Sequence, residues 1–90
     1  MDYFAKYNQA AFDLKHDIVN AMKEVLKEKG YVAPKKGENT VVVRADGKRI
    51  ELYYDRVVVN DWHTDHLSVE ELLEALQACY HVLPFYPYGW

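Results

Sequence analysis

The first third of the chain carries a regular apolar stripe that requires one long helix. Positions 2–29 contain no proline and no glycine, and apolar residues recur there at alternating steps of three and four. The stripe predicts an amphipathic helix over about residues 2–29, ended by Gly30, which adopts left-handed backbone angles easily. The stripe comprises Phe4, Tyr7, Ala11, Leu14, Ile18, Ala21 and Val25, flanked by Phe12, Val19, Met22 and Leu26.

A helix of this length reaches farther than a small sheet. At 1.5 Å per residue it spans roughly 40 Å, which exceeds the length of five-residue strands. The first turns, with Phe4 and Tyr7, are therefore expected to extend past the sheet. The stripe suits either a coiled-coil seam or a core face, and its broad apolar arc favours packing on a sheet. The overhang indicates a partner protein or a homo-oligomer.

The segment TVVVRADGKRIELYY, residues 40–54, predicts a β-hairpin. Asp46 and Gly47 suit a type I′ turn because both tolerate positive φ. The stretch RVVVN at 56–60 is either a third strand after a tight turn or a bulged continuation of the second. We therefore expect an antiparallel meander of two to three strands over about 40–60. The Asp46-Gly47 turn pairs Val43 with Ile50 and Val41 with Leu52. The core face of the hairpin then carries Val41, Val43, Ala45, Ile50, Leu52 and Tyr54.

The last third predicts a second helix followed by an aromatic tail. Ser68 and Glu71 form a capping-box pattern that opens a helix over about 68–81, and two prolines in PFYPYGW prevent its continuation. The tail, residues 82–90, either completes the core or binds a partner. The whole chain, 1–90, is expected to be a single α+β domain with both helices on one face of the sheet. The apolar stripe of this second helix comprises Val69, Leu72, Leu73, Leu76 and Tyr80 or Cys79.

Charge and cysteine content exclude several classes of protein. The net charge is −3, and no Lys or Arg follows Arg56, so the acidic C-terminal third argues against nucleic-acid binding. The only cysteine, Cys79, cannot form an intramolecular disulfide and is expected to be a small buried apolar residue. Because no apolar stretch approaches membrane-spanning length, we expect a cytoplasmic protein that is not bound to a membrane.

Residues 61–66, DWHTDH, combine two histidines with two aspartates. On an extended segment Asp61, His63 and Asp65 point the same way, and His66 adds a second imidazole, a set that suits Zn²⁺, Fe²⁺ or Mn²⁺. The string resembles the His-x-His-x-Asp-His motif of metallo-β-lactamase-fold hydrolases, with Asp61 at the first His position. The resemblance covers only this loop and implies a metal-dependent hydrolase. The other interpretation is a polar turn before a helix, with Trp62 packed on the C-terminal aromatic residues.

The expected order, helix, three strands and helix, matches the double-stranded RNA-binding domain. The stretch LKEKGYV…KKG…ADGKRIEL also resembles the small HicA-like toxin ribonucleases. The chain departs from both families at their functional positions. Residues 68–71, Ser-Val-Glu-Glu, replace the lysines with which the RNA-binding domain grips phosphates. Where the toxins place a catalytic histidine after a glycine, Gly37 is followed by Glu38, Asn39 and Thr40. RNA binding is therefore the third hypothesis.

These patterns favour a small cytoplasmic protein-interaction or regulatory module that associates with itself. Nothing in the sequence argues for catalysis, since the only serine, Ser68, is accounted for as a helix cap. No cofactor is expected. A metal-binding protein or metal-dependent hydrolase using Asp61, His63, Asp65 and His66 is the alternative. The predicted interaction surface comprises Phe4, Tyr7, Phe85, Tyr86, Tyr88 and Trp90.

Overall fold

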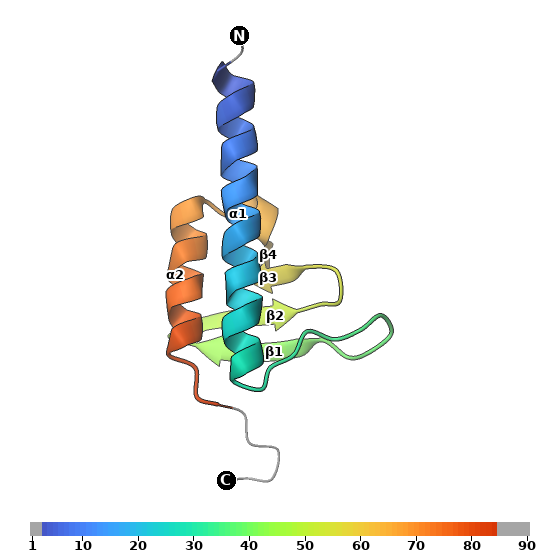
Figure 1. The fold of residues 1–90 in the computed structure, drawn as a ribbon. Coiled ribbons are helices and arrows are strands. Elements are labelled where there is room, and N and C mark those ends of the chain that lie inside the picture. Colours follow the sequence, from blue (N-terminus) through green and yellow to red (C-terminus); the bar gives the residue numbers. More distant parts are fainter. Residues whose placement is uncertain (1–2, 85–90) are drawn as a thin grey trace.

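The chain forms an α+β fold in which a long helix precedes a four-stranded sheet and a second helix (Figure 1). This architecture is taken from a computed structural model that describes residues 3–84, with side chains described for 9–84. The elements are α1 (Tyr3–Glu28), β1 (Val41–Ala45), β2 (Lys48–Leu52), β3 (Val57–Val59), β4 (Trp62–His63), the 3₁₀ turn η1 (Thr64–His66) and α2 (Val69–Tyr80). The side chains of the predicted interaction surface, Phe4, Tyr7, Phe85, Tyr86, Tyr88 and Trp90, lie outside the described residues.

α1 ends where the sequence predicts, in a glycine cap after Glu28. Gly30 has a left-handed φ of 94°. Its N–H donates to the carbonyl of Lys27 at 3.0 Å, and the N–H of Tyr31 donates to the carbonyl of Leu26 at 2.9 Å. This pair of bonds is the Schellman motif, which satisfies carbonyls that lack a partner within the helix.

The four strands form one antiparallel sheet in the order β1-β2-β3-β4. The predicted hairpin register is confirmed, because Val43 lies opposite Ile50 and Val41 lies opposite Leu52. The sheet has one strand more than the two or three expected. β4 is only two residues long, which is too short for an alternation of apolar and polar residues to indicate a strand.

Two tight turns and one wider loop connect the strands. Asp46 and Gly47 have φ of 49° and 76°, and Asn60 and Asp61 have φ of 50° and 70°. Both pairs therefore suit the type I′ geometry that matches the twist of a hairpin. Residues 53–56 form the wider loop, which the Tyr53 N–H closes by donating to the Arg56 carbonyl at 2.9 Å. Of the two alternatives for 56–60, the separate third strand is correct.

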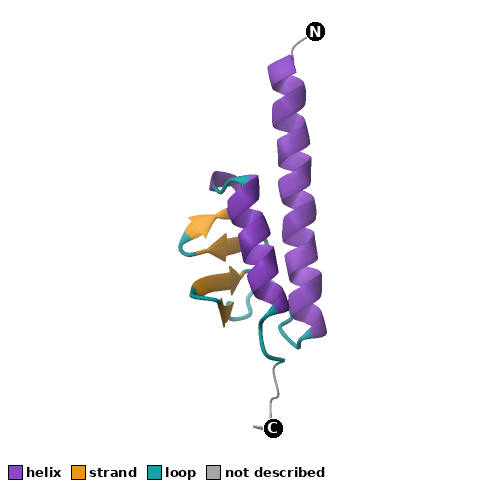
Figure 2. Ribbon diagram, turned by 90° about the vertical axis from the view of Figure 1, so that its left-hand side faces the viewer, coloured by secondary structure: helices purple, strands orange, loops and turns teal. Residues whose placement is uncertain are grey.

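The predicted capping box at the start of α2 is confirmed. The Ser68 hydroxyl accepts from the Glu71 N–H at 3.1 Å, and the Glu71 carboxylate accepts from the Ser68 N–H at 3.0 Å. The second of these bonds lowers the pKa of Glu71. Both helices cover the same face of the sheet (Figure 2). They pack side by side and run in the same direction (Figure 1).

The core lies between the two helices and the inner face of the sheet. Val43, Ile50 and Leu52 are buried as predicted, and Cys79 is fully buried among apolar side chains. Burial raises the pKa of the Cys79 thiol to about 11. The buried apolar residues are Ile18, Met22, Val25, Leu26, Val43, Ala45, Ile50, Leu52, Val57, Val59, Leu67, Leu72, Ala75, Ala78, Cys79 and Val82.

On the hairpin and on α2, three residues predicted on apolar faces are exposed. Tyr54 was expected on the core face of the hairpin, but β2 ends at Leu52, so the alternation does not reach it. Leu73 and Tyr80 lie one position round α2 from the buried face, which runs through Leu72 and on to Cys79. The apolar arc of α2 is therefore wider than the part that the core uses.

The N-terminal half of α1 projects beyond both the sheet and α2 (Figures 1 and 2). The predicted overhang is thus confirmed. Burial on α1 begins at Ile18, whereas Phe12 and Leu14 remain 48% and 46% exposed. Although α1 has 26 residues, no helix in the described part of the chain is long and apolar enough to cross a membrane.

Candidate functional site

Residues 61–66 are not one extended loop but a turn, a short strand and a 3₁₀ turn. Asp61 occupies the left-handed turn after β3, with φ of 70°. His63 ends β4 opposite Val58, and η1 follows at once. An extended alternation that would align Asp61, His63 and Asp65 is therefore absent from this segment. The prediction of a polar turn before α2 describes the backbone better than an extended ligand segment does.

The four predicted metal ligands do not converge. The Asp61 carboxylate forms an ion pair with the guanidinium of Arg49 on β2. His63 Nδ1 lies 3.4 Å from a carboxylate oxygen of Asp65, while the rings of His63 and His66 are 6.3 Å apart. Within residues 9–84, no three His, Cys, Asp or Glu side chains are grouped so that they could hold a metal ion. Metal binding by this segment remains a hypothesis without a preformed site.

Trp62 does not have the packed environment that we expected. Its side chain is 61% exposed on β4, the strand at the edge of the sheet. The aromatic residues of the tail lie outside the described residues, so the predicted contact with them has no described partner. The residues that follow, His63, Thr64 and Asp65, line a cavity against α1.

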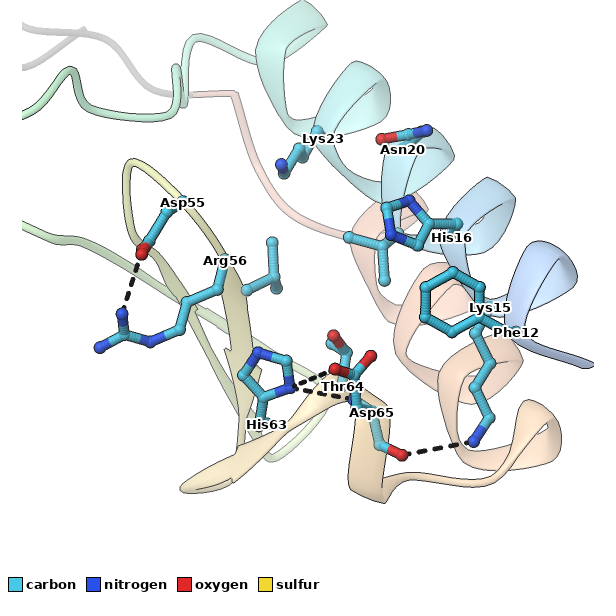
Figure 3. Close-up of a pocket in the computed structure, with 12 residues that line it drawn as sticks. Phe12, Lys15, His16, Asn20, Lys23, Asp55, Arg56, His63, Thr64 and Asp65 are labelled. Atoms are coloured by element: carbon cyan, nitrogen blue, oxygen red, sulfur yellow. Dashed lines mark hydrogen bonds and ion pairs between the residues drawn. The ribbon is translucent and has the colours of Figure 1, made fainter. Parts of the chain in front are cut away.

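That cavity is a groove between α1 and the β3–β4 side of the sheet (Figure 3). We name it the α1 groove. Its volume is about 250 Å³, and Val57, which is buried, contributes to its floor together with Val19. The α1 groove is lined by Phe12, Lys15, His16, Val19, Asn20, Lys23, Asp55, Arg56, Val57, His63, Thr64 and Asp65.

The groove is lined by more cationic than anionic side chains, although the chain as a whole carries −3. Three cations, Lys15, Lys23 and Arg56, stand against two carboxylates, those of Asp55 and Asp65. Asp55 is paired with the Arg56 guanidinium at 3.0 Å. Lys15 donates a long bond of 3.5 Å to the Asp65 carbonyl. Among the described residues, Lys23 makes neither a hydrogen bond nor an ion pair, so its ammonium is available to a ligand.

The orientation of His63 is fixed by its own turn. Nδ1 accepts from the N–H of Asp65 at 3.1 Å, as an N-cap does for η1. A neutral ring that accepts at Nδ1 carries its proton on Nε2. In Figure 3 this second nitrogen lies on the side of the ring away from Asp65, towards the groove. His63 therefore offers the groove a hydrogen-bond donor.

An aromatic pair forms the α1 wall of the groove. The rings of Phe12 and His16 are tilted at 48° with centroids 5.0 Å apart. Both side chains are exposed, and Figure 3 shows them facing the β3–β4 side across the groove. The wall therefore combines an apolar ring surface with a group able to donate hydrogen bonds.

The sequence interpretation missed this groove because its two walls are far apart in the chain. One signal was nevertheless present on α1. Phe12, His16, Val19 and Lys23 recur at steps of four, three and four, which places them along one face of a helix. That face lies beside the core stripe and mixes aromatic, apolar and cationic residues. The opposite wall, from residues 55–57 and 63–65, carries no such pattern.

A second polar network, which shares Arg56 with the groove, lies along β2 and the loop that follows it. Arg49 Nε lies 3.0 Å from Glu51, and the Tyr53 hydroxyl donates to the same carboxylate at 2.7 Å. That hydrogen bond, together with burial and the charge of Glu51, raises the pKa of Tyr53. Arg56 lies over the Tyr53 ring at 4.2 Å. The network engages Arg49, which also forms the ion pair with Asp61.

Comparison of the chain with protein-family profiles, with curated protein sequences and with solved structures gave no match.

Proposed function

We propose that this protein is a small interaction module that associates with a second copy of itself through the projecting half of α1. One observation carries the proposal: α1 continues past the sheet and past α2, and apolar residues on that part remain exposed. Leu14 belongs to the same stripe that is buried from Ile18 onwards. An apolar stripe that leaves its own core indicates a surface for a partner.

The spacing of the stripe favours a second copy as that partner. Along the sequence, Phe4, Tyr7, Ala11 and Leu14 follow steps of three, four and three, which is symmetric about its own midpoint. Two such helices in antiparallel arrangement place position 4 opposite position 14, and position 7 opposite position 11. Each large aromatic residue then meets a smaller aliphatic one, as alternating knobs and holes require.

The middle of the proposed interface carries small side chains. Ala10 and Ala11 are small, and Ala10 is exposed while Ala11 is half-buried. Small residues at the centre of a helix pair allow the two backbones to approach closely. No proline or glycine interrupts the helix there, so the helical backbone that carries the stripe is already formed. Preformed surfaces lose little conformational entropy when they associate.

Sedimentation equilibrium of the wild-type chain, Leu14→Asp and Gln9→Asp tests this proposal. Leu14→Asp places a charge within the apolar stripe and is expected to leave only the 10.6 kDa monomer. Gln9→Asp adds the same charge to the same helix half, but position 9 lies on the face away from the stripe, where Gln9 bonds Asp13 at 3.1 Å. The control is expected to associate like the wild-type protein.

Two results would contradict the proposal. The first is a wild-type mass that stays at 10.6 kDa up to millimolar concentration. The second is equal weakening of association by Leu14→Asp and Gln9→Asp, because a general charge effect would then explain the loss. Circular dichroism of both variants verifies that α1 is retained, so a failure to fold is distinguished from a failure to associate.

A further inference from the structure

We propose that the α1 groove binds a small organic anion whose charged oxygens are carried on a flat apolar ring. The groove is separate from the proposed self-association stripe, which lies on another face of α1. Its chemistry combines an unpartnered ammonium, a positioned imidazole donor and an aromatic wall within about 250 Å³. Each of the three features matches one part of such a ligand.

The charged end of the ligand is expected near Lys23. The Lys23 side chain is half-buried and has no hydrogen-bond or ion-pair partner in residues 9–84. Figure 3 places its ammonium over the groove, on the same side as the ring of His16. Because Asp55 is already paired with Arg56, and three cationic side chains line the groove against two carboxylates, an added anion meets an excess of positive charge.

The apolar ring of the ligand is expected to lie over Val19 and Val57, against the ring of Phe12. Val57 is buried at the floor, and Phe12 is 48% exposed at the wall. Aromatic rings prefer offset or tilted contacts of the kind that Phe12 already makes with His16. A ligand ring in this position removes apolar surface from water on both of its faces.

The probe for this site is phenyl phosphate, titrated into the ¹⁵N-labelled chain and followed by two-dimensional NMR. We expect saturable shifts at backbone amides of residues 12–23, 55–57 and 63–65, with a Kd of about 1 mM, as is typical of a ligand of this size. Inorganic phosphate lacks the ring and benzyl alcohol lacks the charge. Each is expected to bind at least about tenfold more weakly than phenyl phosphate.

Matched variants assign the charged end. Lys23→Gln keeps the length of the side chain and removes the charge, and is expected to weaken phenyl phosphate binding about fivefold to tenfold. Arg44→Gln removes a cation from β1, on the outer face of the sheet, and is expected to leave binding unchanged. The Leu14→Asp variant is expected to keep the site, so the test is independent of self-association.

The proposal is overturned by any of three results. The first is that phenyl phosphate produces no saturable shifts in the α1 groove. The second is that inorganic phosphate or benzyl alcohol binds as tightly as phenyl phosphate. The third is that Lys23→Gln binds phenyl phosphate as tightly as the wild-type protein does. The amide spectrum of Lys23→Gln establishes that the fold is kept. If that variant is unfolded, His63→Leu, which has no side-chain donor, is titrated in its place and is expected to weaken binding about threefold or more.

Discussion

Truncation of Met22 tests whether the stripe of α1 is divided into a core half and a free half. Met22 is fully buried at the centre of the cluster formed by both helices and the sheet. Met22→Ala removes its contacts and leaves a cavity, at a cost of about 2–5 kcal/mol. A chain of 90 residues has a free energy of unfolding of roughly 5–13 kcal/mol, so this single change removes a large share of it.

Leu14→Ala is the matched comparison on the same helix. Leu14 is 46% exposed, and full burial of a leucine contributes about 1.5–3 kcal/mol, so its partial burial accounts for about 0.8–1.6 kcal/mol. Urea unfolding of both variants at the same protein concentration measures the two costs. The division of the stripe is refuted when Leu14→Ala destabilises the chain as much as Met22→Ala does, because Leu14 would then be buried in the monomer.

Three further predictions concern local structure. Ser68→Ala removes the capping box and is expected to lower the free energy of unfolding by about 1 kcal/mol. The pKa of Glu71 is lowered in the folded state, so the wild-type chain is expected to lose stability as the pH falls below 4.5, the ordinary pKa of this carboxyl group. Unfolding measured along an acid titration checks this. Cys79 is expected to resist thiol reagents at pH 8 until the chain unfolds. Because the thiol has a pKa of about 11 in the folded chain and an ordinary pKa of 9.0, the stability that it contributes is present below about pH 9. That stability is lost as the pH rises towards 11. Gly47→Ala meets no steric neighbour, but its φ of 76° is expected to cost about 1 kcal/mol, whereas the same change at an exposed helix site costs nothing comparable.

Local signals in the sequence were sufficient for much of the fold. Asp46-Gly47 predicted the first hairpin and its register, and Ser68 with Glu71 predicted the start of α2. Each of these features is decided by residues within a few positions of one another. The overhang of α1 also followed from length alone, because helix rise and strand length are fixed by backbone geometry.

The fourth strand was missed because the turn residue before it, Asp61, was interpreted as a metal ligand. Asn60 and Asp61 both adopt positive φ, as Asn and Asp tolerate better than most residues, and so form a second type I′ turn. The sequence interpretation instead considered Asp61 as a metal ligand. Two residues of strand, Trp62 and His63, are too few for periodicity to reveal.

The candidate site could be predicted only in part. His63 and Asp65 were identified as candidate site residues and do line the α1 groove. Their neighbours there come from α1 and from the loop between β2 and β3, which tertiary packing alone brings together. The face through Phe12 and Lys23 was visible as a helical spacing, but nothing in the sequence said what would lie opposite.

Self-association through the projecting half of α1 is tested most directly by a cysteine placed at the centre of the proposed helix pair. Ala10→Cys, in a Cys79→Ala background, puts two exposed thiols near the symmetry axis, and a disulfide requires Cα atoms within about 7 Å. Glu24→Cys, on the half of α1 that packs on the core, is the control. The account predicts that mild oxidation converts Ala10→Cys, and not Glu24→Cys, into a covalent dimer at micromolar concentration. Equal dimer yields from the two variants, or no dimer from either, would contradict it.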